Sequence, residues 1–140
     1  MLFRSAAADL GHHRFIYAYR IWDGPLETGG VAEAADAMND PLITVPGSSV
    51  PLRLMNCSDP SVVVESVKLS EDGTGDLVIR LYESMGGTRT ALIHPCLPFS
   101  AACTCSLAED PAEILPVKDG TFTLSFRPFE IITLRLARKG

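Results

Sequence analysis

The sequence has no apolar run close to the roughly 20 residues that a helix needs to cross a bilayer. Its first residues, Met1–Ser5, also lack the apolar core of a signal peptide. Cations are scarce as well, with 12 Lys and Arg against 17 Asp and Glu and a formal net charge of −5. A nucleic-acid-binding surface needs clustered cations to neutralise phosphates, so that class is excluded. We expect a cytoplasmic protein with neither membrane nor nucleic acid as a partner.

Short catalytic motifs are absent too. The chain contains no G-x-G-x-x-G opening a helix, no P-loop, no H-E-x-x-H and no G-x-S-x-G. Gly73 and Gly75 lie before an expected strand, whereas glycines that bind phosphate precede a helix N-terminus. They are therefore interpreted as hairpin-turn residues.

Four cysteines are present, and no two of them form a C-x-x-C pair. Cys103 and Cys105 are two residues apart, which on a strand places them on one face without the geometry of a zinc knuckle. A disulfide framework is not typical of a cytoplasmic chain of this size. We expect Cys57, Cys96, Cys103 and Cys105 to be buried or half-buried free thiols that act as small apolar residues.

The composition is that of a folded protein. Apolar residues make up 46% of the 140 residues and charged residues 21%, which excludes a disordered chain. This length suits one domain, or one domain and a fragment of another.

The strongest structural signal is a β-hairpin. Residues 61–69 and 76–83 are rich in β-branched and large apolar side chains, and the acidic, glycine-rich residues 70–75 between them favour a reversal. Both runs carry apolar side chains on both alternating faces. The hairpin is therefore expected inside a sheet whose two faces are largely covered.

Other strands follow from residue alternation. Residues 121–126 alternate Phe and Leu with Thr and Ser, and residues 131–137 direct Ile132, Leu134 and Leu136 inward. Further strands are predicted over 12–21, which should be buried, and over 42–45, 52–55, 88–93 and 100–107. One short helix is predicted over Val31–Met38, and residues 109–113 read as a polar loop. About eight short strands indicate an all-β fold, an antiparallel β-sandwich with one short helix.

The best candidate boundary is the turn-rich stretch Pro46–Pro51. It divides the chain into residues 1–45, with the helix, and residues 46–140, with most of the strands.

Histidines are the first candidates for chemistry. His12 and His13 are adjacent on the predicted strand and point to opposite faces, so together they do not hold one metal ion. His94 lies near Cys96, but a catalytic pair of this kind needs a third orienting group, and no motif supplies one. A structural role is favoured for all three histidines.

Carboxylates and aromatic rings are the remaining candidates. The pairs Glu71–Asp72 and Glu109–Asp110 could resemble the two carboxyl groups of a glycosidase, but beside Gly and Pro they are interpreted as solvated turn residues. Exposed coplanar rings would favour sugar binding. The rings in question, which we expect in the core, are Tyr17, Tyr19, Trp22 and Tyr82.

Four blocks, in register along nearly the whole chain, resemble the C-terminal end of α-mannosidases of glycoside hydrolase family 38, closest to the cytosolic and bacterial type. The blocks are Asp9-x-Gly-x-His-Arg-Phe15 with Tyr17-Ala18, Glu33-Ala34 with Asn39-x-Pro-Leu42, Val63-x-Glu-Ser-Val-Lys68 with Ile79-Arg-Leu-Tyr-Glu83, and Arg127-Pro-Phe-Glu-Ile131 with Thr133-Leu-Arg-Leu136. The chain departs from the family around Tyr19–Trp22, where relatives place a Pro-His pair.

The resemblance implies a role within a larger retaining α-mannosidase. Family members carry an aspartate nucleophile, a carboxylic acid and a zinc ion in an N-terminal domain, and no position here matches those motifs. No catalytic, cofactor-binding or metal-binding residue is therefore expected in this chain, and zinc is expected in the absent catalytic domain. Residues 1–45 would be the closing segment of a preceding β-sandwich and 46–140 the last β-sandwich.

The expected partner is the catalytic half of the same enzyme, and an uncovered contact surface that includes residues 12–21 would favour self-association. The alternative is a free-standing β-sandwich that binds carbohydrate or a protein.

Overall fold

The structure, a computed structural model, describes residues 11–26, 29–40, 43–44, 46–47 and 53–139. Its elements are α1 (Val31–Asn39), β1 (Met55–Cys57), β2 (Val62–Leu69), β3 (Leu77–Glu83), β4 (Arg89–Pro95), β5 (Phe99–Cys105), β6 (Pro111–Ile114), β7 (Phe122–Phe126) and β8 (Ile131–Arg138). No helix in this described part is long and apolar enough to cross a membrane.

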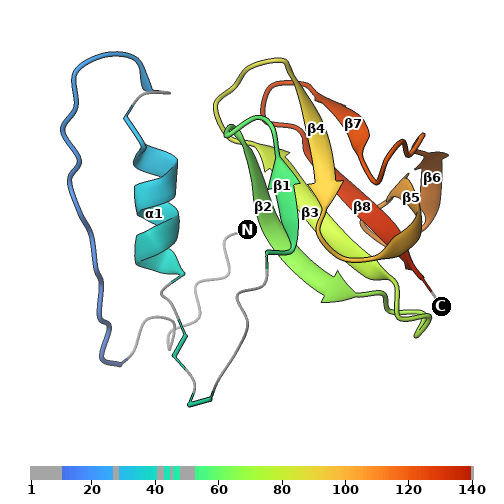
Figure 1. Ribbon diagram of the computed structural model, residues 1–140. Helices are drawn as coiled ribbons and strands as arrows, with labels where there is room; N and C mark the ends of the chain where they lie inside the picture. The colour runs from blue at the N-terminus through green and yellow to red at the C-terminus, as the bar shows by residue number, and fades with distance from the viewer. Residues whose placement is uncertain (1–10, 27–28, 41–42, 45, 48–52, 140) are drawn as a thin grey trace, which may run out of the picture.

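The strands form two antiparallel sheets. One sheet has the order β1-β4-β7 and the other the order β2-β3-β8-β5-β6. Figure 1 shows the two sheets packed against each other, with α1 beside the β2 edge. The predicted all-β sandwich with one short helix is confirmed.

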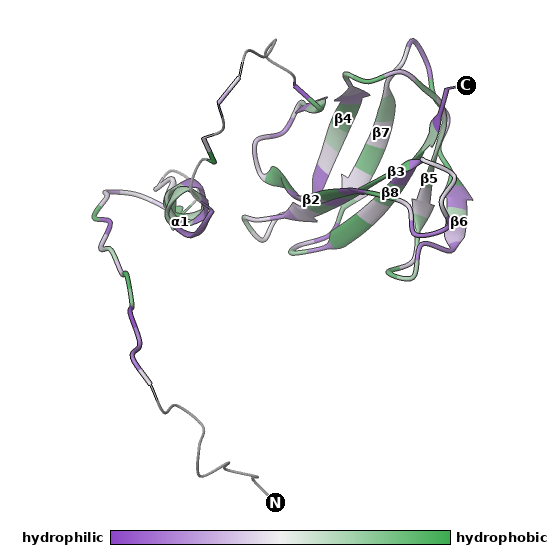
Figure 2. Cartoon of the chain, turned by 90° about the horizontal axis from the view of Figure 1, so that it is seen from below, coloured by the Kyte–Doolittle hydropathy of each residue, from purple (hydrophilic) through white to green (hydrophobic). Residues whose placement is uncertain are grey.

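The core lies between the sheets and follows the predicted alternation. In β7 the side chains alternate strictly between buried and exposed, and Figure 2 shows the same alternation of hydropathy along β4 and β7. Leu134 of β8 is fully buried opposite Ile79 of β3. The inward directions predicted for residues 131–137 are therefore correct. The buried apolar residues that form the core cluster are Val62, Ile79, Leu81, Ala91, Ile93, Ala102, Leu115, Phe122, Leu124, Phe126, Leu134 and Leu136.

The predicted central hairpin is present as β2 and β3, but only β3 is covered on both faces. β3 lies between β2 and β8, whereas β2 is the outermost strand of its sheet. The register of β2 shifts between Val64 and Ser66, and most of its side chains are exposed. The expectation that both strands are covered on both faces is therefore met by β3 and is wrong for β2, the edge strand.

The polar stretch after β5 contains a strand that alternation did not predict. β6 pairs with β5 at the edge of the larger sheet, and its four side chains are all exposed. A strand that buries no side chain carries no hydrophobic period. The prediction of a loop over 109–113 is therefore wrong for its second half.

The N-terminal region differs most from expectation. Residues 12–22 have no regular secondary structure and are exposed, so the buried strand predicted over 12–21 is wrong for this chain. A strand persists only where it can pair and bury its side chains. The helix predicted over Val31–Met38 is confirmed as α1. Half of the short strand predicted over 42–45 and most of the boundary stretch Pro46–Pro51 lie outside the described residues, and residues 43–44 have no regular secondary structure.

Candidate interaction surface

An exposed row of aromatic and apolar side chains runs along residues 12–21, which we call the aromatic segment. Phe15, Ile16, Tyr17, Tyr19 and Ile21 have 69–96% of their surface exposed. The ring of His13 stacks on Phe15 with centroids 6.2 Å apart, and Tyr17 meets Tyr19 edge to face at 6.0 Å. Contiguous exposed apolar side chains of this kind mark interaction surfaces. Tyr17 and Tyr19 were expected in the core, and that expectation is wrong.

Trp22 joins the aromatic segment to α1. Its ring covers Gly29 so closely that a Cβ atom there would lie 2.7 Å from the indole, which explains why glycine occupies this position. The indole N–H donates a hydrogen bond to the carbonyl oxygen of Pro25, at 3.2 Å. The aromatic segment and the helix are thereby held as one local unit, with α1 starting after Gly30.

The apolar stripe of α1 belongs to the same uncovered region. The stripe comprises Val31, Ala34, Ala35 and Met38, and no residue of α1 is fully buried. A nine-residue helix is not stable alone and depends on burying its apolar face. The stripe should therefore be docked on other residues, yet in this chain it is covered only in part.

The acidic turn between β2 and β3 has a structural role. Arg135 of β8 donates hydrogen bonds to Asp72 and, at 2.8 Å, to Asp76. The guanidinium of Arg135 and the hydrogen bonds from Thr74 and Ser70 hold the pKa of Asp72 well below its ordinary value. Both carboxylates therefore fasten the turn to β8.

Glu109 is not the solvated turn residue that we expected. It has only 8% of its surface exposed and adopts a φ of 69°, which directs its side chain to Lys68 of β2 at 2.6 Å. The hydrogen bond from Lys68 and that from the backbone N–H of Glu71 lower the pKa of Glu109. Glu71 and Glu109 thus tie the hairpin to the loop before β6. This arrangement does not resemble an open pair of catalytic carboxyl groups.

Glu83 at the end of β3 is the fully buried carboxylate that sequence reasoning missed. It accepts hydrogen bonds from the backbone N–H groups of Met85 (3.0 Å), Gly86 (2.7 Å) and Phe129 (3.0 Å). Burial alone would raise the pKa of Glu83, but these hydrogen bonds outweigh it and the pKa is lowered. Gly86 and Gly87 after β3 indicate a turn in the sequence, but they do not indicate that the turn binds the buried carboxylate of Glu83.

The histidines and cysteines are not brought together into a reactive group. His12, His13 and His94 are exposed. The Cys96 sulfur lies 3.3 Å from the Asn56 amide nitrogen and 3.8 Å from the carbonyl oxygen of His94.

All four cysteines are free thiols. The expectation of buried or half-buried thiols is confirmed for Cys57, Cys103 and Cys105, which are half-buried, and is wrong for Cys96, which is exposed. Within the described residues, no three His, Cys, Asp or Glu side chains are placed to hold a metal ion.

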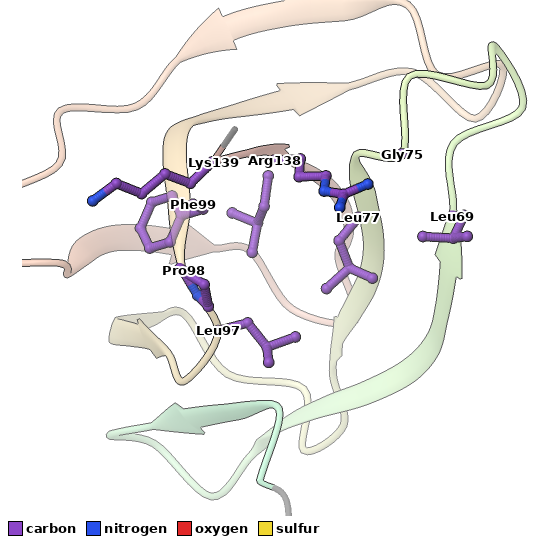
Figure 3. Close-up of a pocket in the computed structure, with 9 residues that line it drawn as sticks. Leu69, Gly75, Leu77, Leu97, Pro98, Phe99, Arg138 and Lys139 are labelled. Carbon is purple, nitrogen blue, oxygen red and sulfur yellow. The ribbon is translucent and has the colours of Figure 1, made fainter.

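A largely apolar hollow of about 470 Å³ lies where the chain crosses from β4 to β5. Figure 3 shows Leu77, Leu97 and Phe99 around it, with Arg138 and Lys139 from the end of the chain nearby. Small-molecule sites combine an apolar wall with several polar groups that converge on the ligand. The charged residues that line this hollow are Arg138 and Lys139, and Figure 3 shows their charged ends pointing apart. The aromatic segment with α1 is therefore the stronger candidate surface.

Comparison with known proteins gives a family match. The model of the glycosyl hydrolases family 38 C-terminal beta sandwich domain matches residues 61–134, from β2 into β8.

Curated relatives match over nearly the whole chain. Human alpha-mannosidase 2C1 is 37% identical in an alignment 139 residues long that covers 94% of this chain and 13% of the human protein. The mouse alpha-mannosidase 2C1 is 34% identical with the same shares. Alpha-mannosidase G of Dictyostelium discoideum is 27% identical over 91% of this chain and 12% of its own length. The chain thus spans about an eighth of the relatives that it matches.

Proposed function

Because this chain belongs to the family of C-terminal β-sandwich domains of family 38 glycosyl hydrolases, we propose that it is the non-catalytic C-terminal part of an α-mannosidase. Its role is to pack on and stabilise the part of the enzyme that hydrolyses α-mannosides. The relatives support this proposal, since all three are α-mannosidases of which this chain matches about an eighth.

The observation that carries the proposal is the exposure of the aromatic segment. A segment that alternates Phe15, Tyr17 and Tyr19 with apolar residues has the composition of a buried strand, yet these rings are exposed. Burying one such ring is worth about 1.5–3 kcal/mol. We infer that residues 1–45 are the closing segment of a preceding β-sandwich, whose core the aromatic segment completes, and that residues 46–140 are the last domain.

We assign the hydrolysis of α-mannosides to the rest of the polypeptide. A retaining glycosidase needs two carboxyl groups about 5–5.5 Å apart across the scissile bond. The most buried carboxylates here, Glu83 and Glu109, are instead occupied by backbone N–H groups and Lys68. A catalytic zinc ion takes three protein ligands, and the described residues offer no such set. The zinc ion that the family resemblance implies is therefore proposed for the catalytic domain.

The carbohydrate-binding alternative is less well supported. A sugar-binding platform presents flat, coplanar rings, whereas the rings of Tyr17 and Tyr19 are inclined at 82°. The ring of Trp22 is packed against Gly29 rather than standing free for a sugar.

We also propose a cytoplasmic location, which the four free thiols support because disulfides are rare in that compartment.

The proposal is tested by binding. This chain would be mixed with human alpha-mannosidase 2C1 that lacks the region matched by this chain, and binding would be measured by calorimetry. We expect association, and we expect Phe15→Ser with Tyr17→Ser to weaken it at least about tenfold. Leu107→Ser, which alters an equally exposed side chain in the β5–β6 loop, is the matched control and should bind as the unaltered chain does. No association, or equal binding by the double variant, would overturn the proposal.

A further inference from the structure

Phe129, between β7 and β8, combines two unfavourable features. Its backbone has a φ of 57°, in the left-handed region that bulky residues rarely adopt, and its side chain is 69% exposed. Neither feature stabilises the isolated domain. A bulky residue kept in such a conformation is a reason to look for a function.

The conformation of Phe129 is held by two carboxylates. Its N–H donates to the buried Glu83 at 3.0 Å, and Glu83 also binds the N–H of Gly86 at 2.7 Å. The Glu130 side chain accepts hydrogen bonds from the backbone N–H of Arg127 at 2.7 Å and from its guanidinium at 2.7 and 3.0 Å. The turn is thus fixed from both sides, and the exposed ring is not the result of a loose loop.

Gly86 packs against one part of the Phe129 ring. It has a φ of 73°, and a Cβ atom there would lie 2.7 Å from the Cζ atom of Phe129. The ring therefore packs on bare backbone of the β3–β4 turn, while part of it stays open to an outside group.

A groove leads from Phe129 to α1. A hollow of about 430 Å³ is lined by Phe129, Ile131, Tyr82 and Glu65, among others. Glu65 and Tyr82 also line a second hollow, of about 190 Å³, whose other wall includes Asp36 of α1 and Asp40 at the end of that helix. We call the two hollows together the Phe129 groove. Its floor is apolar near Phe129 and Ile131.

The α1 end of the Phe129 groove is acidic. Asp36 and Asp40 line it, and within the described part of the chain neither side chain has an ion pair. Glu65 is half exposed, with the Arg80 Nε atom 3.7 Å away. The pKa of Tyr82 is raised, first by burial and then by the nearby carboxylates of Asp36 and Glu65. A cation is the complementary partner at this end.

We propose that the Phe129 groove binds a segment of the catalytic portion of the same enzyme, with an apolar side chain on Phe129 and Ile131 and a Lys or Arg beside Glu65 and Asp36. This assignment rests on the proposed function. The occupant is taken from the same polypeptide because the relatives are about eight times as long as this chain, which leaves a large covalently linked partner. The Phe129 groove would then be a second contact, separate from the aromatic segment.

The test is hydroxyl-radical footprinting of this chain alone and within human alpha-mannosidase 2C1, where it replaces the matched region. If the chimera does not fold, the mixture of the two separately produced parts is used. We expect Phe129 to be oxidised readily in the isolated chain and to be protected in the larger protein. Ile114 is the internal control and should react equally in both, because it is at least as exposed as Phe129 and lies on β6, at the opposite edge of the larger sheet from β2.

The outcomes separate the two proposals. Protection of Phe15 and Tyr17 without protection of Phe129 would overturn the Phe129 groove and leave the proposed function intact. If Phe15, Tyr17 and Phe129 all react as readily in the larger protein as in the isolated chain, both the Phe129 groove and the proposed function are overturned.

A second variant tests the chemistry of the occupant. Asp36→Asn with Glu65→Gln should restore the oxidation of Phe129 in the larger protein, whereas Glu113→Gln, on exposed β6, should not. Unchanged protection in the double variant would overturn the assignment of a basic segment.

Discussion

Glu83→Gln should weaken the β-sandwich by removing the buried carboxylate beneath two turns. In the native chain one carboxylate oxygen accepts the N–H of Met85, and the other accepts those of Gly86 and Phe129. Glutamine has nearly the same shape, but one of its terminal groups is a donor. At least one buried N–H therefore loses its acceptor.

The magnitude follows from these contacts. An orphaned buried donor costs about 1–3 kcal/mol, and the hydrogen bonds that remain go to a neutral acceptor, which is weaker by about 1 kcal/mol. The smaller desolvation cost of the amide offsets part of this loss. We expect the free energy of unfolding to fall by about 2–3 kcal/mol.

Urea denaturation at neutral pH measures this loss. The matched control is Glu113→Gln on β6, an exposed position where a change within about 0.5 kcal/mol is expected. Equal midpoints for the two variants would refute the reasoning, because they would show that the Glu83 charge is not needed to hold the turns.

Three further predictions concern the core, pH and association. Leu134→Ala should cost about 2–5 kcal/mol, since Leu134 is fully buried, and an unchanged urea midpoint would show that the faces of β8 are misassigned. Folding lowers the pKa values of Glu83, Glu109 and Asp72 below the ordinary values of 4.5 for Glu and 3.8 for Asp. These ionised carboxylates therefore stabilise the folded chain at a pH above the ordinary values, and this stabilisation is lost as the pH falls through the lowered values. Urea midpoints should therefore drop between about pH 5 and pH 3, and a flat profile would contradict this sign. The isolated chain should self-associate through the aromatic segment, with a smaller mass by light scattering for Phe15→Ser with Tyr17→Ser; a strict monomer at high concentration would argue against it.

Alternation predicted the parts of the fold whose side chains divide between core and solvent. β7 and β8 were recognised because Phe122, Leu124 and Leu134 recur with the period of a half-buried strand. β6 was missed because it buries nothing. The aromatic segment was predicted as a strand because its composition suits a sheet, but no strand among the described residues pairs with it. Sequence patterns report what a segment is suited to bury, whereas the structure reports what is available to cover it.

The candidate sites divide in the same way. The exposed aromatic surface could be anticipated from a segment that is apolar on both faces. The roles of Glu83 and Glu109 could not, because each depends on groups far away in the sequence: Glu83 binds the N–H of Phe129, and Glu109 binds Lys68. The φ of Phe129 also left no mark in the residue pattern, since a bulky aromatic residue does not signal a left-handed conformation.

The central claim is that this chain supports catalysis by another part of an α-mannosidase without taking part in the chemistry. It is tested by measuring hydrolysis of an aryl α-mannoside with added zinc or cobalt. The samples are this chain, human alpha-mannosidase 2C1 that lacks the region matched by this chain, and their mixture. We predict no turnover by the chain alone and higher, longer-lived activity in the mixture than in the truncated enzyme. Turnover by the chain alone that is abolished by substituting one of its own carboxylates would contradict the account.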